Sequence, residues 1–118
     1  MQAMVRGMAL KPGMVTIDCA DPRALAAFWT EAAGYHMAVD YGVFVVLEGD
    51  GISLGLQQVP EPRSGKNRVH IDWHTDDREG EVKRLVDLGA TVLGEQEVPG
   101  LRWTVLADPE GNEFCVGG

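Results

Sequence analysis

The first part of the chain alternates between hydrophobic and polar residues and then changes to a helical period. Residues 14–19 alternate and contain β-branched side chains, which predicts a strand. Pro22 stands at the first helical position. Apolar residues then recur at the helical spacing i, i+3, i+4 and i+7, namely Leu25, Phe28, Trp29 and Ala32. Asp21 supplies the N-cap, and Gly34 is typical of a helix end. The pattern therefore predicts a strand followed by an amphipathic helix.

Shorter alternating stretches follow the helix and are separated by turn residues. Strands are predicted over residues 35–39, 43–47 and 52–59. The intervening segments Asp40–Gly42 and Glu48–Gly51 carry the Gly and Asp residues that favour turns. The first half of the chain therefore has the predicted order strand, helix, strand, strand, strand.

The second half repeats this order after a linker, residues 60–67, that contains two prolines and a Ser-Gly pair. Asp21 and Asp76 are as far apart in the sequence as Gly34 and Gly89, so the signals for helix start and helix end recur together. The elements predicted for the second half are a strand over 68–75, a helix from Asp76 or Asp77 to Gly89, and strands over 90–97, 101–107 and 113–116.

The chain length fits one domain built from two such halves. A chain of 118 residues can bury a core, whereas one half alone would be marginally stable. We expect residues 1–13 to form an N-terminal tail and residues 14–118 to form a single domain. Within this domain, modules 14–59 and 68–117 would be joined by the linker 60–67.

Composition and charge narrow the classes of function. The formal net charge of −8 opposes binding to the phosphates of nucleic acid. The sequence has no apolar run long enough to predict a membrane-spanning segment. An acidic protein is compatible with a cationic ligand, although acidity often serves solubility alone. Cys19 and Cys115 lack metal-site spacing, so we expect buried free thiols and a cytoplasmic protein.

Strand parity divides the side chains between two faces of each sheet. In the stretch 68–75 the apolar residues Val69, Ile71 and Trp73 are predicted to lie under the helix. The opposite face is predicted to border solvent or a cleft. That face would hold Met14, Thr16 and Asp18 of the first strand, Ser53, Gly55 and Gln57 of the fourth, His70, Asp72 and His74 of the fifth, and Glu113 and Cys115 of the last.

This polar face supplies most of the candidate binding residues. Asp18 and Asp72 recur in the two halves, where they could fix strand ends, bind a cation or act as acid and base. His70 could be hydrogen-bonded within the cleft, contact a ligand or bind a metal ion. Trp103 is the best candidate for an aromatic pocket wall. The predicted ligand-binding residues are His70, Asp72, His74, Gln57, Asp18, Trp103, Glu113 and Cys115.

Three phrases of the sequence resemble the vicinal oxygen chelate superfamily, which includes glyoxalase I, extradiol dioxygenases and bleomycin-resistance proteins. They are Asp18–Pro22, Val69–Asp72 and Asp108–Phe114, and the resemblance extends from about Met14 to Val116. The closest likeness is to compact glyoxalase-like domains. The resemblance implies an α+β fold, in which two βαβββ modules in tandem form a curved mixed sheet around a cleft. Members often form homodimers, which we expect here as well.

The resemblance also implies where a divalent metal ion would bind. Metal-using members place His, Glu or sometimes Gln on the first, fourth, fifth and eighth strands. The corresponding positions here are Met14 or Thr16, then Gln57, His70 and Cys115, with Glu113 as a substitute on the last strand. Met and Thr are poor ligands for a hard cation. We therefore expect no catalytic metal; if one binds, His70, Gln57 and Glu113 would hold it.

The leading functional hypothesis is a glyoxalase-like protein that binds a small molecule in its concave cleft without a catalytic metal. The alternative is a divalent-metal-dependent lyase, isomerase or dioxygenase of the vicinal oxygen chelate type. A third hypothesis is an interaction module whose cleft is filled by its own side chains. The sequence contains no phosphate-binding loop and no serine in a nucleophile elbow.

Overall fold

The computed structural model describes residues 12–65 and 67–118. The N-terminal tail predicted for residues 1–13 lies outside the described residues, apart from Pro12 and Gly13. Within the described chain, no helix is long and apolar enough to cross a membrane.

The first module contains one helix and a four-stranded sheet. Its elements are β1 (Met14–Cys19), α2 (Pro22–Ala33), β2 (His36–Asp40), β3 (Phe44–Glu48) and β4 (Ser53–Gln58). The strands are ordered β1-β4-β3-β2. Strand β1 runs parallel to β4, and the other neighbours are antiparallel.

The second module repeats this topology. Its elements are β5 (Asp72–His74), α3 (Arg78–Leu88), β6 (Thr91–Val98), β7 (Leu101–Ala107) and β8 (Glu113–Gly117). The strand order is β5-β8-β7-β6, with β5 parallel to β8. The predicted α+β fold of two tandem βαβββ modules is therefore confirmed, with the mixed sheet divided into two four-stranded sheets.

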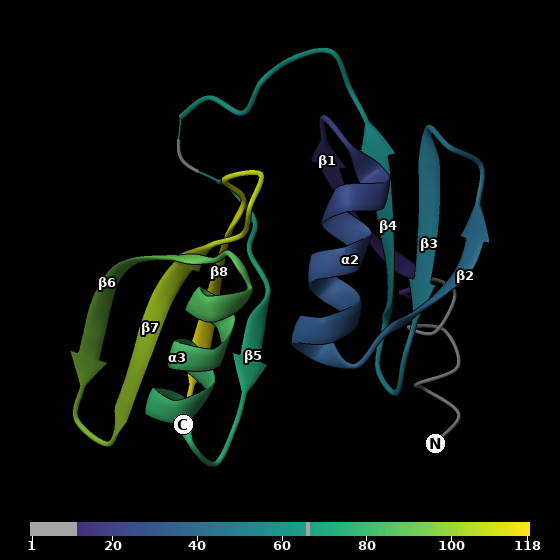
Figure 1. The fold of residues 1–118 in the computed structure, drawn as a ribbon. Coiled ribbons are helices and arrows are strands. Elements are labelled where there is room, and N and C mark those ends of the chain that lie inside the picture. The colour runs from purple at the N-terminus through teal and green to yellow at the C-terminus, as the bar shows by residue number, and fades with distance from the viewer. Residues whose placement is uncertain (1–11, 66) are drawn as a thin grey trace, which may run out of the picture.

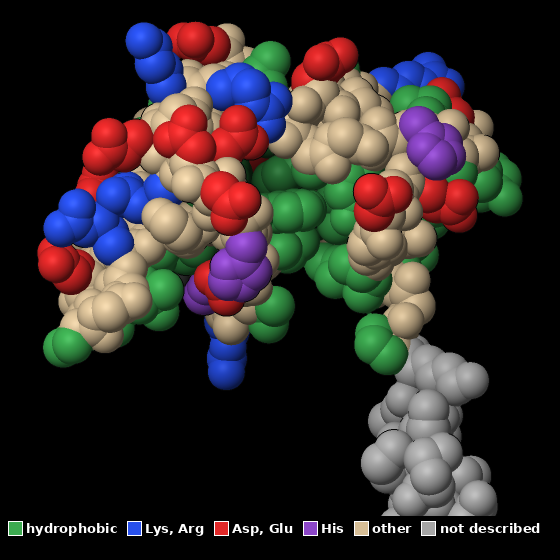
Figure 2. Space-filling view, turned by 90° about the horizontal axis from the view of Figure 1, so that it is seen from below, with side chains coloured by type: hydrophobic (Ala, Val, Ile, Leu, Met, Phe, Trp, Pro, Cys, Tyr) green, Lys and Arg blue, Asp and Glu red, His purple; other side chains and the backbone are tan. Residues whose placement is uncertain are grey.

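The two modules lie side by side, with edge strands β1 and β5 facing the junction (Figure 1). Helices α2 and α3 cover the same side of the molecule, each over its own sheet. The linker passes over one end of the junction. The view from below shows a recess between the modules with hydrophobic side chains around it (Figure 2). The opposite face of each sheet is therefore not covered by a helix.

Helix α2 forms as its capping residues predict. The Asp21 carboxylate accepts a hydrogen bond from the Ala24 N–H at 3.2 Å, and Pro22 occupies the first helical position. Gly34 ends the helix with a φ of 71°, a left-handed conformation that glycine adopts without strain. The helix buries Leu25, Ala26, Phe28 and Trp29 over the first sheet.

The modules are joined through Trp29. Its ring stacks on Trp73 at 5.3 Å between centroids and meets Phe114 edge-on at 5.0 Å. Its Nε1–H donates to Oδ2 of the buried Asp108 at 3.4 Å. Because Trp73, Phe114 and Asp108 all belong to the second module, this side chain makes one continuous core from two half-size modules.

The turn before β8 contributes to the same interface. Oδ1 of Asp108 accepts the N–H groups of Glu110 and Asn112, both at 2.9 Å. Burial raises the pKa of the Asp108 carboxyl, and these hydrogen bonds oppose the rise. The Glu110 carboxylate accepts two N–H groups from the residues just before α2, those of Ala20 and Asp21, at 3.0 Å each. The Asp-Pro-Glu-Gly-Asn phrase therefore has a structural role.

The start of the second module differs from the sequence prediction. A strand was predicted over 68–75, but β5 begins only at Asp72. The parallel ladder with β8 stops at the bond from the Cys115 N–H to the Ile71 carbonyl, and the Asn67 side chain binds the next free carbonyl, that of Glu113. The prediction that Val69 lies under the helix is wrong, because Val69 sits in this unpaired segment and is 79% exposed.

Candidate functional site

An open groove of about 790 Å³ lies on the helix-free face of the second sheet. It takes residues from all four strands and from the segment before β5. A volume of this size suits a drug-sized organic molecule. The lining residues are His70, Asp72, Trp73, His74, Leu93, Gly94, Gln96, Leu101, Trp103, Val105, Glu113, Cys115 and Gly117.

The pairing register orders the groove from a polar wall to an apolar wall. Residues that are opposite one another on neighbouring strands project to the same face. Strand β5 supplies polar side chains, β7 supplies apolar side chains, and β8 between them supplies small residues. The two rows across the sheet are Asp72–Cys115–Val105 and His74–Gly117–Trp103. The small residues Cys115 and Gly117 form the groove floor.

The apolar wall is built by β6 and β7. Thr104 and Leu106 on β7 are fully buried on the helix side, so the alternating residues Trp103 and Val105 face the groove. Leu93 and Leu101 extend this wall and are each 51% exposed. An exposed apolar wall beside an aromatic ring is suited to a flat, partly apolar ligand.

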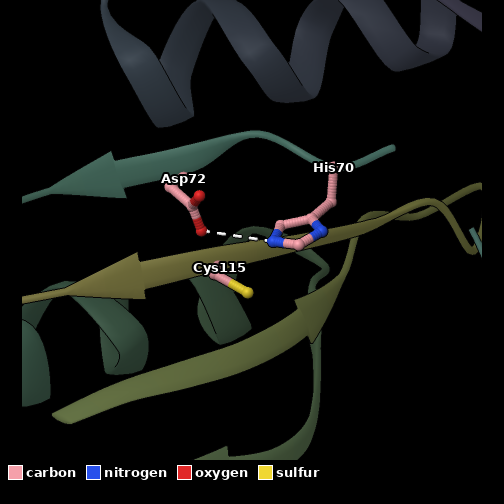
Figure 3. Close-up of side chains that lie close together, drawn as sticks. All are labelled: His70, Asp72 and Cys115. Atoms are coloured by element: carbon pink, nitrogen blue, oxygen red, sulfur yellow. Dashed lines mark ion pairs between the residues drawn. The ribbon is translucent and has the colours of Figure 1, made fainter. Parts of the chain in front are cut away.

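The polar end of the groove brings together His70, Asp72 and Cys115 (Figure 3). Nε2 of His70 lies 3.3 Å from Oδ1 of Asp72, which forms an ion pair when the imidazole is protonated. One donor atom from each of the three residues lies within 4.8 Å of the others. His70 comes from the segment before β5, so its position depends on the unpaired backbone there.

The Cys115 thiol is poorly suited to act as a nucleophile. Burial raises its pKa, and the negative charges of Asp72 and Glu113 raise it further. A nucleophilic cysteine needs the opposite environment, in which nearby positive charge stabilises the thiolate. The thiol therefore stays protonated near neutral pH and contributes a small, weakly polar surface.

Glu113 lines the groove, but its carboxylate is already paired. Nη2 of Arg63, from the linker, lies 2.7 Å from Oε2 of Glu113. The Arg63 Nε–H donates to Oδ1 of Asn67 at 3.3 Å. These contacts attach the linker to the start of β8.

Six of the eight predicted binding residues come together in the groove. They are His70, Asp72, His74, Trp103, Glu113 and Cys115. Asp18 and Gln57 are instead opposite each other on β1 and β4 in the first sheet. Asp18 lines a smaller cavity of about 230 Å³ at the module junction, which His70 and Glu113 also reach. Gln57 lines neither of these two cavities.

Several lining residues were not predicted. Leu101 and Val105 share a face with Trp103 and could have been found from the alternation in 101–107 once the face of Trp103 was known. Leu93, Gln96 and Gly117 gave no comparable signal, because their neighbours in the groove are distant in sequence.

The described residues do not fit the hard divalent cation that the superfamily resemblance implies. Met14 or Thr16 occupies the first-strand position, and neither side chain is a good ligand for such an ion. Gln57 lies on the other sheet, and Glu113 is paired with Arg63. Among the described residues, the acidic, His and Cys donors that converge are His70, Asp72 and Cys115, a set with one protonated sulfur.

Another cavity, of about 390 Å³, lies on the helix side of the junction. Arg84 of α3 donates there to the last carbonyls of α2, those of Glu31 at 3.0 Å and Ala32 at 2.7 Å. Its guanidinium also pairs with Glu81 at 2.8 Å. Because these bonds tie the two helices together, we assign this region a structural role.

Fold and site together define a class: paired βαβββ modules with an open groove on the helix-free face, as in the vicinal oxygen chelate superfamily. The chain belongs to the glyoxalase-like domain family, whose pattern it matches over residues 14–117. The resemblance inferred from the three sequence phrases is thereby confirmed.

Solved structures share this fold. A glyoxalase/bleomycin resistance protein/dioxygenase family enzyme from Burkholderia phytofirmans PsJN has a TM-score of 0.80 at 21% identity, covering 92% of this chain and 98% of that one. Lactoylglutathione lyase from Agrobacterium tumefaciens has a TM-score of 0.67 at 22% identity, covering 89% and 90%.

A third similar structure contains a metal ion. It is a mutant of the fosfomycin resistance protein FosX from Listeria monocytogenes, complexed with Mn(II) and 1S,2S-dihydroxypropylphosphonic acid. Its TM-score is 0.77 at 15% identity, covering 92% of this chain and 88% of that one. Comparison with curated protein sequences gives no match. At these identities the likenesses establish the fold and leave activity to the site.

Proposed function

We propose that this protein binds a small organic molecule in the groove of the second sheet, without a catalytic metal. The observation that carries the proposal is the groove itself: an apolar wall with Trp103, a polar wall with Asp72 and His74, and a floor of two small residues. Ligand sites combine a mainly apolar lining with a few polar groups that fix orientation. The protonated Cys115 thiol supports a binding role over nucleophilic catalysis.

A ligand screen by thermal shift tests this proposal directly. Binding to the native state raises the melting temperature by mass action. We expect flat, partly apolar molecules to raise the melting temperature in the presence of a chelator. A Trp103→Ala variant should lose most of this rise, whereas Phe44→Leu, a change on the helix-free face of the first sheet, should keep it. If the Phe44 variant loses the response and the Trp103 variant keeps it, the groove is not the site.

A metal-dependent lyase, isomerase or dioxygenase remains the second candidate. The convergence of His70, Asp72 and Cys115 is the observation that favours it, since these three side chains offer nitrogen, oxygen and sulfur donors. Metal analysis of protein purified without chelator separates the two candidates. A stoichiometric metal that is lost in His70→Ala would contradict the metal-free proposal and favour the metal-dependent enzyme. Substoichiometric metal in both the wild-type protein and the variant would support the metal-free proposal.

The assembly and location of the protein are further parts of this proposal. We expect a homodimer, because the outer strands β2 and β6 have unpaired edges in the described chain and β6 exposes Val92 and Val98. Sedimentation velocity would test the dimer.

We expect a cytoplasmic protein, since Cys19 and Cys115 are both free and buried, as is usual in a reducing compartment. Residues 14–118 would fold as one domain through the Trp29 contacts.

A further inference from the structure

We infer that the groove selects ligands that combine a flat apolar ring system with a protonated amine. The inference rests on the proposed function and names the ligand class of that same groove. It comes from the distribution of charge and apolar surface around the groove floor, in two steps.

The ionisable side chains that line the groove are carboxylates, imidazoles and the Cys115 thiol. Among the residues that the structure describes, those lining the groove include no lysine or arginine. The Glu113 carboxylate is paired with Arg63, but the Asp72 side chain is 65% exposed, and its ion-pair partner in the described chain is His70, at 3.3 Å. Asp72 can therefore receive a cation from the groove.

The apolar wall is placed to hold the rest of such a ligand. Trp103 lies across β8 from the polar strand β5, two strand spacings or about 10 Å away. Between them, Gly117 places no side chain over the floor: a Cβ added there would have its nearest neighbour, Cβ of Trp103, at 3.8 Å. A ring can therefore lie against the Trp103 face while an attached amine reaches Asp72. Attraction of a cation to a partly solvated carboxylate, and to an aromatic face, favours the charged form of the ligand.

Three probes of the same shape test this charge selection: naphthylmethylamine, naphthalenemethanol and naphthylacetate. They are positive, neutral and negative at neutral pH. Isothermal titration calorimetry at low ionic strength should give the amine roughly tenfold tighter binding than the alcohol, with the acetate weakest. Asp72→Asn should reduce the amine to the affinity of the alcohol. Its unchanged affinity for the alcohol would show that the variant is still folded.

Asp18→Asn is the matched control, because it removes the same charge from the other sheet. It should leave the preference for the amine intact. Equal binding of all three probes, or tightest binding of the acetate, would overturn the charge selection while the groove remained the binding site. An equal effect of Asp18→Asn and Asp72→Asn would also overturn it, because net charge alone would then explain the preference. Failure of every probe to bind would count instead against the proposed function.

Discussion

The helix-free faces of the two sheets share one topology but differ in what lies over their middle strand. In the first sheet, Phe44, Thr16 and Met14 converge over Gly55, so closely that a Cβ there would lie 2.9 Å from Phe44 Cζ and 3.0 Å from Met14 Sδ. In the second sheet, the comparable strand carries Cys115 and Gly117, and a Cβ added at Gly117 would lie no closer than 3.8 Å to its nearest neighbour, Cβ of Trp103. Duplication of the fold therefore supplies two faces, and the residues of the middle strand decide which face is open.

The helix sides of the two modules also differ, and here the first module is the one that buries more apolar surface. Helix α2 buries a continuous apolar surface, whereas α3 buries only Arg78 and Leu85. The Arg78 side chain is 7% exposed and donates to Oγ1 of Thr104 at 2.8 Å, but its Nε has no partner in the described chain. A buried charge with an unmet donor stabilises less than a well-packed apolar residue. We conclude that the first module supplies most of the core, whereas the proposed binding groove lies on the second module.

The largest effect is expected for Trp29→Ala, which removes the side chain that joins the two cores. Loss of a fully buried tryptophan lowers the free energy of unfolding by about 3–5 kcal/mol. Urea denaturation monitored by circular dichroism would measure this value. A loss below about 1 kcal/mol would show that the modules are stable without this contact.

Filling the groove floor is expected to remove ligand binding with little effect on folding. In Gly117→Leu the new side chain would occupy the groove floor between His74 and Trp103, and Gly117 has no positive φ that would strain it. Affinity for any groove ligand should fall by roughly tenfold or more, as expected when about 1.4 kcal/mol or more of binding energy is lost. Calorimetry with naphthylmethylamine would measure it. Unchanged affinity together with a normal melting temperature would place the site elsewhere.

A smaller effect should distinguish the two middle strands directly. Gly55→Ala forces Phe44 and Met14 to move and is expected to lower the free energy of unfolding by about 1 kcal/mol. Gly117→Ala meets only ordinary contacts and should be neutral or slightly stabilising. Urea denaturation of the two variants would measure the change in the free energy of unfolding for each. Equal changes would contradict the proposed difference between the two middle strands.

The smallest effect concerns the thiols at high pH. Burial, followed by the nearby carboxylates beginning with Glu110, raises the pKa of Cys19 from 9.0 to about 11. Between pH 9.0 and about 11 the thiol loses its proton in the unfolded chain but keeps it in the folded protein. The free energy of unfolding therefore falls as the pH rises through this range. Alkylation of Cys19 by iodoacetamide should reach half its maximal rate near pH 11. Rapid alkylation at pH 8 would contradict the buried environment; a Cys115→Ser background keeps the signal specific to Cys19.

Most of the fold was predictable from the sequence because it depends on local signals. The Asp21 and Gly34 caps placed α2, and alternation placed β7 at residues 101–107 as observed. The β5 strand was predicted too long, since its pairing ends where the Asn67 side chain replaces a backbone partner. No periodicity in 68–75 contains that information.

The site was only partly predictable, for a different reason. Parity placed His70, Asp72 and Cys115 on one face, and the structure brings them together. Gln57 was grouped with them because the sequence does not say whether the two helix-free faces share one cavity. The openness of the floor depends on Gly117 lying opposite Trp103 in the register of β7 and β8, which is a tertiary feature.

The central claim, that the groove over β8 is the binding site, is tested most directly by a ¹H–¹⁵N NMR titration with naphthylmethylamine. The account predicts chemical-shift changes at the backbone amides of Val105, Cys115 and Gly117 and at the Trp103 indole, with Gly55 and Phe44 unchanged. Shifts centred on Gly55 and Phe44, with the β8 amides unchanged, would contradict it.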